Sequence, residues 1–589
     1  MELLFIHINK PFGALESKSF NLSSKFNVDY NVNSNVITVS DNQNHLTDFF
    51  GKNITNVTCV IGENGVGKTT FLRYIKELYF ERRNEIDLRD GDIIAYIKDD
   101  NLIIHTSANS TSLGVKILVD GITLKTIKYK SKPKVFDHLK NELTIYYSNN
   151  FDLYDDFVES EILYNTSTPF LSRTYNARIN KEFRTKKVNA EQRFLLNEFQ
   201  RNRKFLQSEK SHSLKYLLKA VDYIEIIPIS KNDVDYKSLI KSIDRLYPKI
   251  NNTKKEDLRE LINNVANAFY TRKKGIISKP RRQLYDIELT EIIVFEVLAK
   301  FLKSEITINN FSYFQDLFIK PIFNNGVKGY LNSFLKKMPK MFLESTLKWK
   351  EKSNELRKYF YNLNELVDLL IYQDELWVEY SDKATVKTNS ELLERIIYRY
   401  FELPFSTNSI KLDWSRLSAG EESMITFFSR IDGALRLKSK KRDNILILID
   451  EGDLYFHPEW QRQYLKAIFD FLKQYKEFNF QIILTSHSPF ILSDLPQDNV
   501  ITFQKTKEGI EVSKNTLSKT FGGNIHELLI DKFFLNKGII GAFADNKIME
   551  LIKKVNNKKI TKQDEMLIEE IGDKFLAAAL KTNLEGKND

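Results

Sequence analysis

The segment that most constrains the fold of this chain is Gly62-Glu-Asn-Gly-Val-Gly-Lys-Thr69. It fits the pattern G-x-x-x-x-G-K-[ST], in which glycines let backbone N–H groups wrap around phosphate oxygens. The apolar run Val57–Ile61 precedes it, and apolar residues at helical spacing follow it over Phe71–Leu78. A strand, a glycine-rich turn and a helix in this order predict a phosphate-binding loop in an α/β fold.

The side chains of this loop have distinct predicted roles. Lys68 is expected to reach the β- and γ-phosphates of a nucleotide, and Thr69 to offer its hydroxyl to a magnesium ion. The residues predicted to bind the nucleotide here are Asn64, Gly65, Gly67, Lys68, Thr69 and Thr70. The predicted cofactors are therefore ATP and Mg²⁺.

A second candidate motif is the apolar run Ile445–Ile449, which ends in Asp450 and Glu451. A continuous apolar strand is typical of a parallel sheet buried on both faces, whose carboxyl edge binds ligands. Asp450 is expected to hold Mg²⁺, and Glu451 to polarise the attacking water as a general base. The alternative is an edge strand that simply reaches solvent at its end.

Two further short motifs surround this strand. Leu417-Ser-Ala-Gly-Glu421 places Ser418 32 residues before Asp450, and Leu484-Thr-Ser-His487 places its histidine 36 residues after Glu451. Ser418 and Gly420 at the start of a helix would form a second anion site. The alternative for Ser418 is a helix N-cap beside an incidental glycine, and a lone histidine is usually structural.

In order and spacing, these motifs resemble the P-loop, the Walker B strand, the LSxGE signature and the switch histidine of ABC-type ATPases. The resemblance implies that Ser418 and Gly420 of one copy close on the γ-phosphate held by the other, in a head-to-tail dimer. It also implies catalytic roles for Glu451 and His487. A transport cassette is not expected, because Lys68 lies 350 residues before Ser418. The chain looks like the non-transport branch that includes the RecF, SMC and OLD-type ATPases.

Two stretches narrow the resemblance. Asp450–Gln461 resembles the corresponding stretch of OLD-like and phage-defence ATPases, with His457-Pro458 where transporters carry Leu-Asp. A Q-loop glutamine is not evident, and Asn149 is its candidate replacement. The segment Phe521–Ala544 is similar to the tail of ATPases in Septu and retron-associated antiphage systems. These ATPases work beside an HNH-type nuclease, which the resemblance implies as a partner.

The predicted fold class is α/β, an ABC-type P-loop ATPase head with a large, mostly helical insertion and a helical C-terminal tail. The head is predicted in two halves, because the β/α rhythm stops near residue 150 and returns at Ile410-Lys-Leu-Asp-Trp414. The predicted domains are the P-loop half at 1–150, the insertion at 151–409, the second half of the head at 410–510 and the tail at 511–589.

Composition limits the other classes of protein. With 42% hydrophobic residues and a single cysteine, Cys59, the chain is neither disordered nor disulfide-bonded internally. No apolar run approaches the roughly 20 residues that cross a bilayer, so a cytoplasmic protein with no membrane partner is expected. The net charge of +10 and the basic clusters 272–282 and 436–442 leave DNA or RNA open as a partner. Solvated helix ends are the alternative.

The predicted function is that of an ATP-hydrolysing sensor or regulator of an antiphage system, which dimerises around ATP and controls an associated nuclease. No nuclease motif is evident, so cutting is expected from the partner. Two alternatives stay open: a DNA-binding ATPase of repair or end processing, and a nucleotide-dependent assembly scaffold with little turnover.

Overall fold

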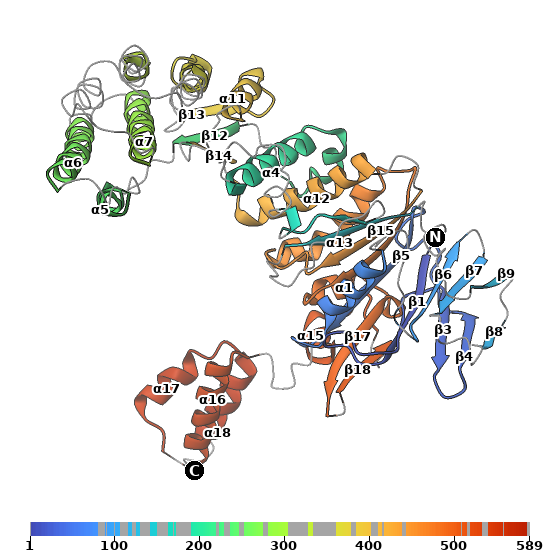
Figure 1. Ribbon diagram of the computed structural model, residues 1–589. Helices are drawn as coiled ribbons and strands as arrows, with labels where there is room; N and C mark the ends of the chain where they lie inside the picture. Colours follow the sequence, from blue (N-terminus) through green and yellow to red (C-terminus); the bar gives the residue numbers. More distant parts are fainter. Residues whose placement is uncertain are drawn as a thin grey trace.

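The computed structural model describes residues 2–79, 89, 91–98, 101–106, 116–120, 125–129, 142–149, 163–168, 170–171, 190–218, 223–228, 236–246, 252–274, 281–303, 328–333, 361–377, 384–401, 410–414, 417–438, 443–507, 509–514, 519–532, 540–557 and 559–585. A seven-stranded sheet lies at the centre of the largest part of the molecule, with the strand order β11-β10-β15-β16-β5-β17-β18 (Figure 1). Its strands are β5 (Ile54–Gly62), β10 (Glu142–Ser148), β11 (Leu163–Asn165), β15 (Asn444–Asp450), β16 (Asn479–Thr485), β17 (Val500–Thr506) and β18 (Gly509–Lys514). Every strand is parallel to its neighbours except β18, which forms a hairpin with β17.

This strand order brings together two parts of the chain that are far apart in sequence. β16 lies between β15 and β5, and its register pairs Thr485 with both Asp450 and Val60. The apolar runs predicted as strands at Val57–Ile61 and Ile445–Ile449 are confirmed, and both are buried. The carboxyl ends of β5, β15 and β16 therefore meet at one edge of the sheet.

Helices cover both faces of this sheet (Figure 1). On one face α12 (Ala419–Lys438) and α13 (Pro458–Leu472) pack in a core with alternate residues of the central strands. On the other face α1 (Lys68–Leu78) packs in a second core with the intervening residues. The alternation explains why these strands are apolar at nearly every position.

Two smaller sheets extend the N-terminal part, as the short β-like runs there predict. One has the order β2-β1-β6-β7-β9 and the other β3-β4-β8. Their strands are β1 (Glu2–Ile8), β2 (Lys18–Asn21), β3 (Phe26–Asn31), β4 (Val36–Asp41), β6 (Ile93–Lys98), β7 (Asn101–Thr106), β8 (Lys116–Asp120) and β9 (Lys125–Tyr129). The first sheet packs on the α1 side of the central sheet.

The segment predicted as a helical insertion contains helices in its described residues, and also strands that were not predicted. The helical elements include α4 (Ala190–Leu206), the 3-10 turn η2 (Glu209–Leu214), α5 (Tyr236–Leu246), α6 (Asn252–Lys274), α7 (Arg281–Lys303), residues 361–371, the 3-10 turn η4 (Asp374–Leu376) and α11 (Glu391–Phe401). β12 (Tyr223–Pro228) pairs antiparallel with β13 (Ala384–Lys387) and with β14 (Ile410–Trp414). The strand at 410–414 is thus confirmed, but it joins this small sheet rather than the central one.

The tail is largely helical, as predicted, although its first residues belong to β18. It contains α15 (Ile525–Lys532), α16 (Ala542–Asn556), α17 (Lys562–Glu569) and α18 (Lys574–Glu585). The last three share a small core of Leu551, Val555, Ile568 and Leu580. Among the described helices, none is both long and apolar enough to span a membrane.

Candidate functional site

The turn between β5 and α1 requires glycine at several positions. Gly62 has φ +151°, and a Cβ there would lie 2.2 Å from the carbonyl oxygen of Phe503 on the paired strand β17. Gly65 and Gly67 have φ +79° and +90°, a conformation that only glycine adopts without strain. The predicted phosphate-binding turn therefore begins where β5 pairs closely with β17, at a position that has no room for a side chain.

Lys68 opens α1 and is buried in this turn. Its ammonium Nζ donates to the carbonyl oxygens of Gly62 at 3.1 Å and Glu63 at 2.9 Å. Burial lowers the pKa of Lys68, and the nearby carboxylates of Glu451 and Asp450 oppose that effect. The lysine therefore lies within electrostatic reach of both predicted Walker B residues, although these are more than 380 positions away in the sequence.

Asp450, the last residue of β15, is the meeting point of three segments. Its Oδ1 accepts hydrogen bonds from the hydroxyl of Thr69 at 3.1 Å and from that of Thr485 at 2.7 Å. Asp450 is 1% exposed, and burial raises its pKa to about 6, with the two hydroxyl bonds acting in the opposite direction. Thr485 has no role in the sequence prediction, yet it ties β16 to the end of β15.

Glu451 follows in an unusual backbone conformation for a side-chain-bearing residue, with φ +47°. Its amide donates to the hydroxyl of Thr485 at 3.0 Å, which fixes the turn. Its carboxylate Oε1 lies 3.5 Å from Nε2 of His487, and both side chains are partly exposed. The structure thus brings together Lys68, Asp450, Glu451 and His487 at the carboxyl edge of the sheet.

Thr69 and Asp450 present oxygen atoms of the kind that Mg²⁺ prefers. Within the described part of the chain, no group of three or more His, Cys, Asp and Glu side chains gathers that could hold a metal by itself. This donor set fits a magnesium ion that completes its shell with phosphate oxygens and water. It does not form a self-sufficient metal cage.

The predicted signature residues lie in another neighbourhood. Ser418 and Glu421 form a reciprocal cap at the start of α12, in which each side chain bonds the other residue's backbone N–H. A Cβ on Gly420 would approach Trp460 Cζ3 at 3.2 Å and the Tyr455 carbonyl at 3.5 Å. Among described residues, Ser418 makes no hydrogen bond to the P-loop or to Asp450 and Glu451. Within a single chain, Ser418 therefore acts as the N-cap of α12, which is the alternative given in the sequence analysis.

The remaining predicted residues surround this edge. Asn64 lies at the exposed tip of the P-loop, and a Cβ on Gly13 would lie 2.9 Å from Thr70 Cγ2. The turn Phe12–Leu15 thus covers the loop from the N-terminal side, a contact that no motif predicts. Asn149, at the end of β10, donates to the hydroxyl of Ser423 in α12 at 3.1 Å. Its Q-loop role stays a prediction.

The two basic clusters are partly engaged in ion pairs. Arg436 pairs with Asp432 on its own helix, and Arg282 donates to Asp374 at 2.9 Å. Lys274 lies over the exposed ring of Tyr270, 5.3 Å from its centroid. Residues 275–280 and 439–442, which complete the predicted clusters, lie outside the described residues. Nucleic-acid contact at these clusters stays a prediction.

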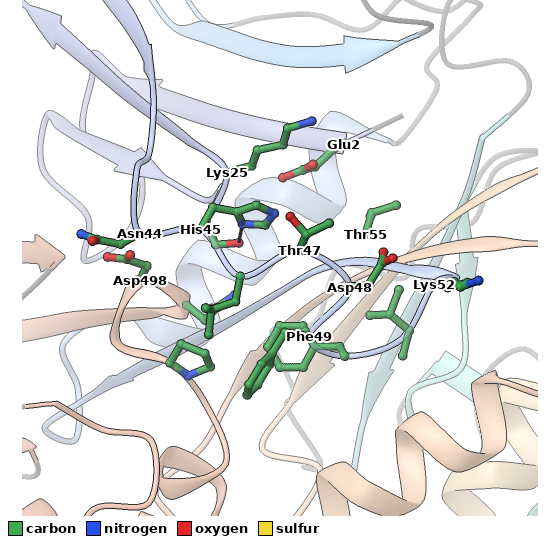
Figure 2. A pocket seen from close by; sticks show the side chains of 16 residues that line it. Glu2, Lys25, Asn44, His45, Thr47, Asp48, Phe49, Lys52, Thr55 and Asp498 are labelled. Atoms are coloured by element: carbon green, nitrogen blue, oxygen red, sulfur yellow. Dashed lines mark hydrogen bonds between the residues drawn. The ribbon is translucent and has the colours of Figure 1, made fainter.

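A separate hollow of about 260 Å³ opens at the other end of β5 (Figure 2). Ile54, the first residue of β5, lies in the wall of this hollow, whereas the P-loop begins at Gly62, the last residue of the same strand. Its walls mix acids and bases, among them Glu2, Lys25, His45 and Asp498. Burial raises the pKa of Glu2 to about 7. The hollow is distinct from the P-loop site.

Comparison with known proteins agrees with this geometry. The model of the AAA ATPase domain family matches residues 41–492, more than three quarters of the chain. The "Retron Vc95 probable ATPase" of Vibrio cholerae serotype O1 biovar El Tor is 26% identical over 181 residues, 29% of this chain and 33% of the relative. The "Retron Ec83 probable ATPase" of Escherichia coli is 31% identical over 104 residues, 17% of this chain and 18% of the relative.

A third relative comes from a phage. "Protein ea59" of Escherichia phage lambda is 25% identical over 178 residues, 27% of this chain and 32% of the relative. The chain therefore spans a third or less of the length of these curated relatives. The likeness is distant, and it includes two retron ATPases.

Proposed function

Because the chain belongs to the family of the AAA ATPase domain, we propose that it hydrolyses Mg²⁺-bound ATP at the P-loop as the regulatory subunit of an antiphage system. Two copies close around ATP, and the nucleotide state of the dimer controls a separate nuclease. One observation carries the proposal: the hydroxyls of Thr69 and Thr485 both bond the Asp450 carboxylate, which unites three distant segments at one site.

The P-loop supplies the binding part of the reaction. The backbone N–H groups of the glycine turn bind phosphate oxygens, and the N-terminus of α1 favours their negative charge. Lys68 leaves the carbonyls of Gly62 and Glu63, which it now bonds, and binds the β- and γ-phosphates. Thr69 Oγ1 and the Asp450 carboxylate would hold Mg²⁺, which would supply positive charge to neutralise the phosphate oxygens.

Glu451 and His487 act on the transferred phosphoryl group. The Glu451 carboxylate orients a water molecule and accepts its proton as the water oxygen bonds the γ-phosphorus and the bond to ADP breaks. His487 Nε2, 3.5 Å from this carboxylate, donates to a γ-phosphate oxygen. The position of His487 beside Glu451 supports a role as a sensor of the γ-phosphate, which is present in ATP and absent from ADP.

A second copy of the chain would complete the site. Ser418 and Gly420 lie at the N-terminus of α12, a position that favours an anion, but they do not bond the P-loop of their own chain. Beside Gly420 the loop after Glu451 exposes two large apolar side chains, Leu454 at 47% and Tyr455 at 61%. An exposed apolar pair beside the signature residues supports closure by a partner copy.

The helix that begins at the signature also leads into the insertion. On α12, Arg430 forms a buried ion pair with Glu198 of α4, at 2.7 Å between Nη2 and Oε2. From α4, Arg203 pairs with Glu394 of α11, inside the insertion. A movement of α12 on closure would therefore act on the buried Arg430–Glu198 pair and, through α4, on the partly exposed Arg203–Glu394 pair, which supports transmission of the nucleotide state to the insertion.

Three measurements test the proposal. The purified chain should release phosphate from Mg²⁺·ATP, and Lys68→Ala should not. When the wild-type chain is expressed with its neighbouring genes, it should reduce the number of phage plaques, and Lys68→Ala should not. Purification of the wild-type chain in the presence of ATP should retain a bound nuclease. Plaque counts that are unaffected, together with salt-dependent binding of bare duplex DNA, would favour repair instead. Absent turnover would favour a scaffold.

A further inference from the structure

Asp453 is a buried carboxylate near the site that the roles above do not use. It lies in the turn after Glu451, is 4% exposed, and accepts a hydrogen bond at Oδ2 from the hydroxyl of Ser486 at 2.9 Å. Ser486 is fully buried, and its hydroxyl in turn accepts from the amide of Ser488 at 2.9 Å. The carboxylate therefore anchors the two residues that flank His487.

A second anchor acts on the same short loop. The hydroxyl of Ser488 donates to Oε1 of Gln461 on α13 at 2.8 Å, and Gln461 Nε2 donates to the Phe456 carbonyl at 3.2 Å. His487 itself is 36% exposed at its side chain. Its backbone is thus held from both sides by its neighbours, and its imidazole faces the Glu451 carboxylate.

The Asp453 side chain is not needed to form its own turn. That turn is closed by backbone bonds from Leu454 N to Glu451 O at 3.2 Å and from Phe456 N to Asp453 O at 3.0 Å. Gly452 fits there because a Cβ would lie 2.3 Å from the Tyr464 hydroxyl. These features would survive the loss of the carboxylate.

Keeping a carboxylate here is unfavourable for the fold alone. Burial raises the pKa of Asp453 to about 6 and Glu451 adds to that effect, while the bonds from the Ser486 hydroxyl and from its own backbone N–H, together with His487, oppose it. A buried acid that these bonds compensate only in part stabilises a fold less than a neutral group would. We therefore look for the benefit of this carboxylate in the loop that it holds through Ser486.

We propose that Asp453 is a positioning residue for His487: through Ser486 it fixes the loop 485–488 so that the imidazole faces Glu451 and the γ-phosphate. This inference rests on the proposed ATPase function. Asp453 does not touch the reacting atoms, and it acts only through the histidine. Its loss should therefore slow hydrolysis without weakening the binding of ATP.

The activity test is a double-mutant cycle. Asp453→Ala should lower kcat about 10- to 100-fold, as for a small misplacement of a catalytic group, and change KM by less than about threefold. In the His487→Ala background, Asp453→Ala should have no further effect, because the group that it positions is gone. Ser486→Ala should match Asp453→Ala, and Asp453→Asn should restore most of kcat because its amide oxygen still accepts from Ser486.

A second readout does not depend on turnover. Hydrogen–deuterium exchange of peptides that cover 484–489 should be about tenfold faster in Asp453→Ala, because the bond to the Ser488 amide is loosened. The matched control is Asp92→Ala, which removes another buried aspartate that a hydroxyl bonds, that of Tyr74, outside the site. It should lower the melting temperature and leave exchange at 484–489 unchanged.

The outcomes separate the two proposals. Unchanged exchange at 484–489 in Asp453→Ala, or effects of Asp453→Ala and His487→Ala that simply add, would overturn the positioning role. If Asp453→Ala does not fold, Ser486→Ala still tests the same loss of kcat, and Asp453→Asn should still keep most of kcat. A wild-type chain without ATP turnover would overturn the proposed function alone, and the exchange experiment would still decide the role of Asp453.

Discussion

At the scale of single residues, Glu451 offers the sharpest separation of binding from chemistry. Glu451→Gln keeps the size of the side chain and removes the group that accepts the proton of water. We expect ATP affinity within about threefold of the wild type and turnover at least about 100-fold lower. Binding of a fluorescent ATP analogue and phosphate release measure the two. The control is Glu459→Gln, whose side chain is exposed on the first turn of α13. Undiminished turnover in Glu451→Gln would show that Glu451 is not the general base.

Asp450 gives a prediction about pH. Because burial raises its pKa in the folded chain from 3.8 to about 6, the folded state holds the proton more tightly than the unfolded state. Its ionisation therefore lowers stability as the pH rises from about 4 to about 6, and the full cost remains above that range. Without nucleotide, Asp450→Asn should be more stable than the wild type near pH 8 by up to about 3 kcal/mol, and should melt at a higher temperature.

The same comparison contains its own control. Near pH 4 Asp450 is protonated in the folded state and only about half ionised in the unfolded state, so most of the advantage of Asp450→Asn should disappear there. Glu2 and Asp494 also have raised pKa values, but they titrate in both proteins and cancel in the difference. A difference in melting temperature that stays constant between pH 4 and pH 8 would contradict the account.

The sequence pointed to the residues to which we assign the chemistry, but not to the neighbours that bond them or their loops. Lys68, Asp450 and His487 belong to motifs, so residue type and spacing reveal them. Thr485 and Asp453 have no such signal, because a threonine and an aspartate near strand ends have many uses. The left-handed backbone of Glu451 is equally hidden, since only the fold imposes a positive φ on a glutamate.

At the scale of elements, the joint between β5 and β17 should be intolerant of a single methyl group. Gly62→Ala places a Cβ 2.2 Å from a backbone oxygen, which cannot move without separating the strands. We expect loss of ATP binding and a melting temperature lower by several degrees. Gly65→Ala is the matched control: its φ is also positive, but nothing lies within 4 Å, so it costs only backbone strain of about 1 kcal/mol. Equal effects of the two substitutions would refute this explanation.

The strands of the central sheet were predictable because they are buried on both faces, which makes them apolar at nearly every position. The small sheet of β12, β13 and β14 was not. β13 has only four residues, and β12 reads Tyr-Ile-Glu-Ile-Ile-Pro among stretches of helical spacing. Its partner β14 lies more than 180 residues away, so the pairing depends on contacts that local pattern does not contain.

At the scale of the whole molecule, closure of two copies can be tested at the signature. Ser418→Arg places a bulky cation where a partner's γ-phosphate should meet α12. In the Glu451→Gln background, sedimentation with Mg²⁺·ATP should show dimers, and adding Ser418→Arg should leave monomers that still bind ATP. Ser418→Thr, which keeps the hydroxyl cap, is the control. Dimers that persist in Ser418→Arg would rule out the signature as the closing surface.

From the sequence, only the order of the segments along the chain was predictable, not how they pack in three dimensions. The motifs predicted one head interrupted by an insertion, and the strand order β10-β15-β16-β5 joins the two stretches that carry those motifs. That β16 lies between β5 and β15, and that α4 packs on α12, follows from three-dimensional packing. The predicted domain boundaries, the dimer and the nuclease partner stay predictions.

The most direct test of the central claim is single-turnover cleavage of Mg²⁺·ATP by variants in each distant segment. If one pocket is formed by all of them, Lys68→Ala, Asp450→Ala, Glu451→Gln and His487→Ala should each slow cleavage at least about 100-fold. Glu459→Gln should cleave like the wild type. Wild-type cleavage in any one of the first four would show that its segment does not belong to the pocket, and the account would fail.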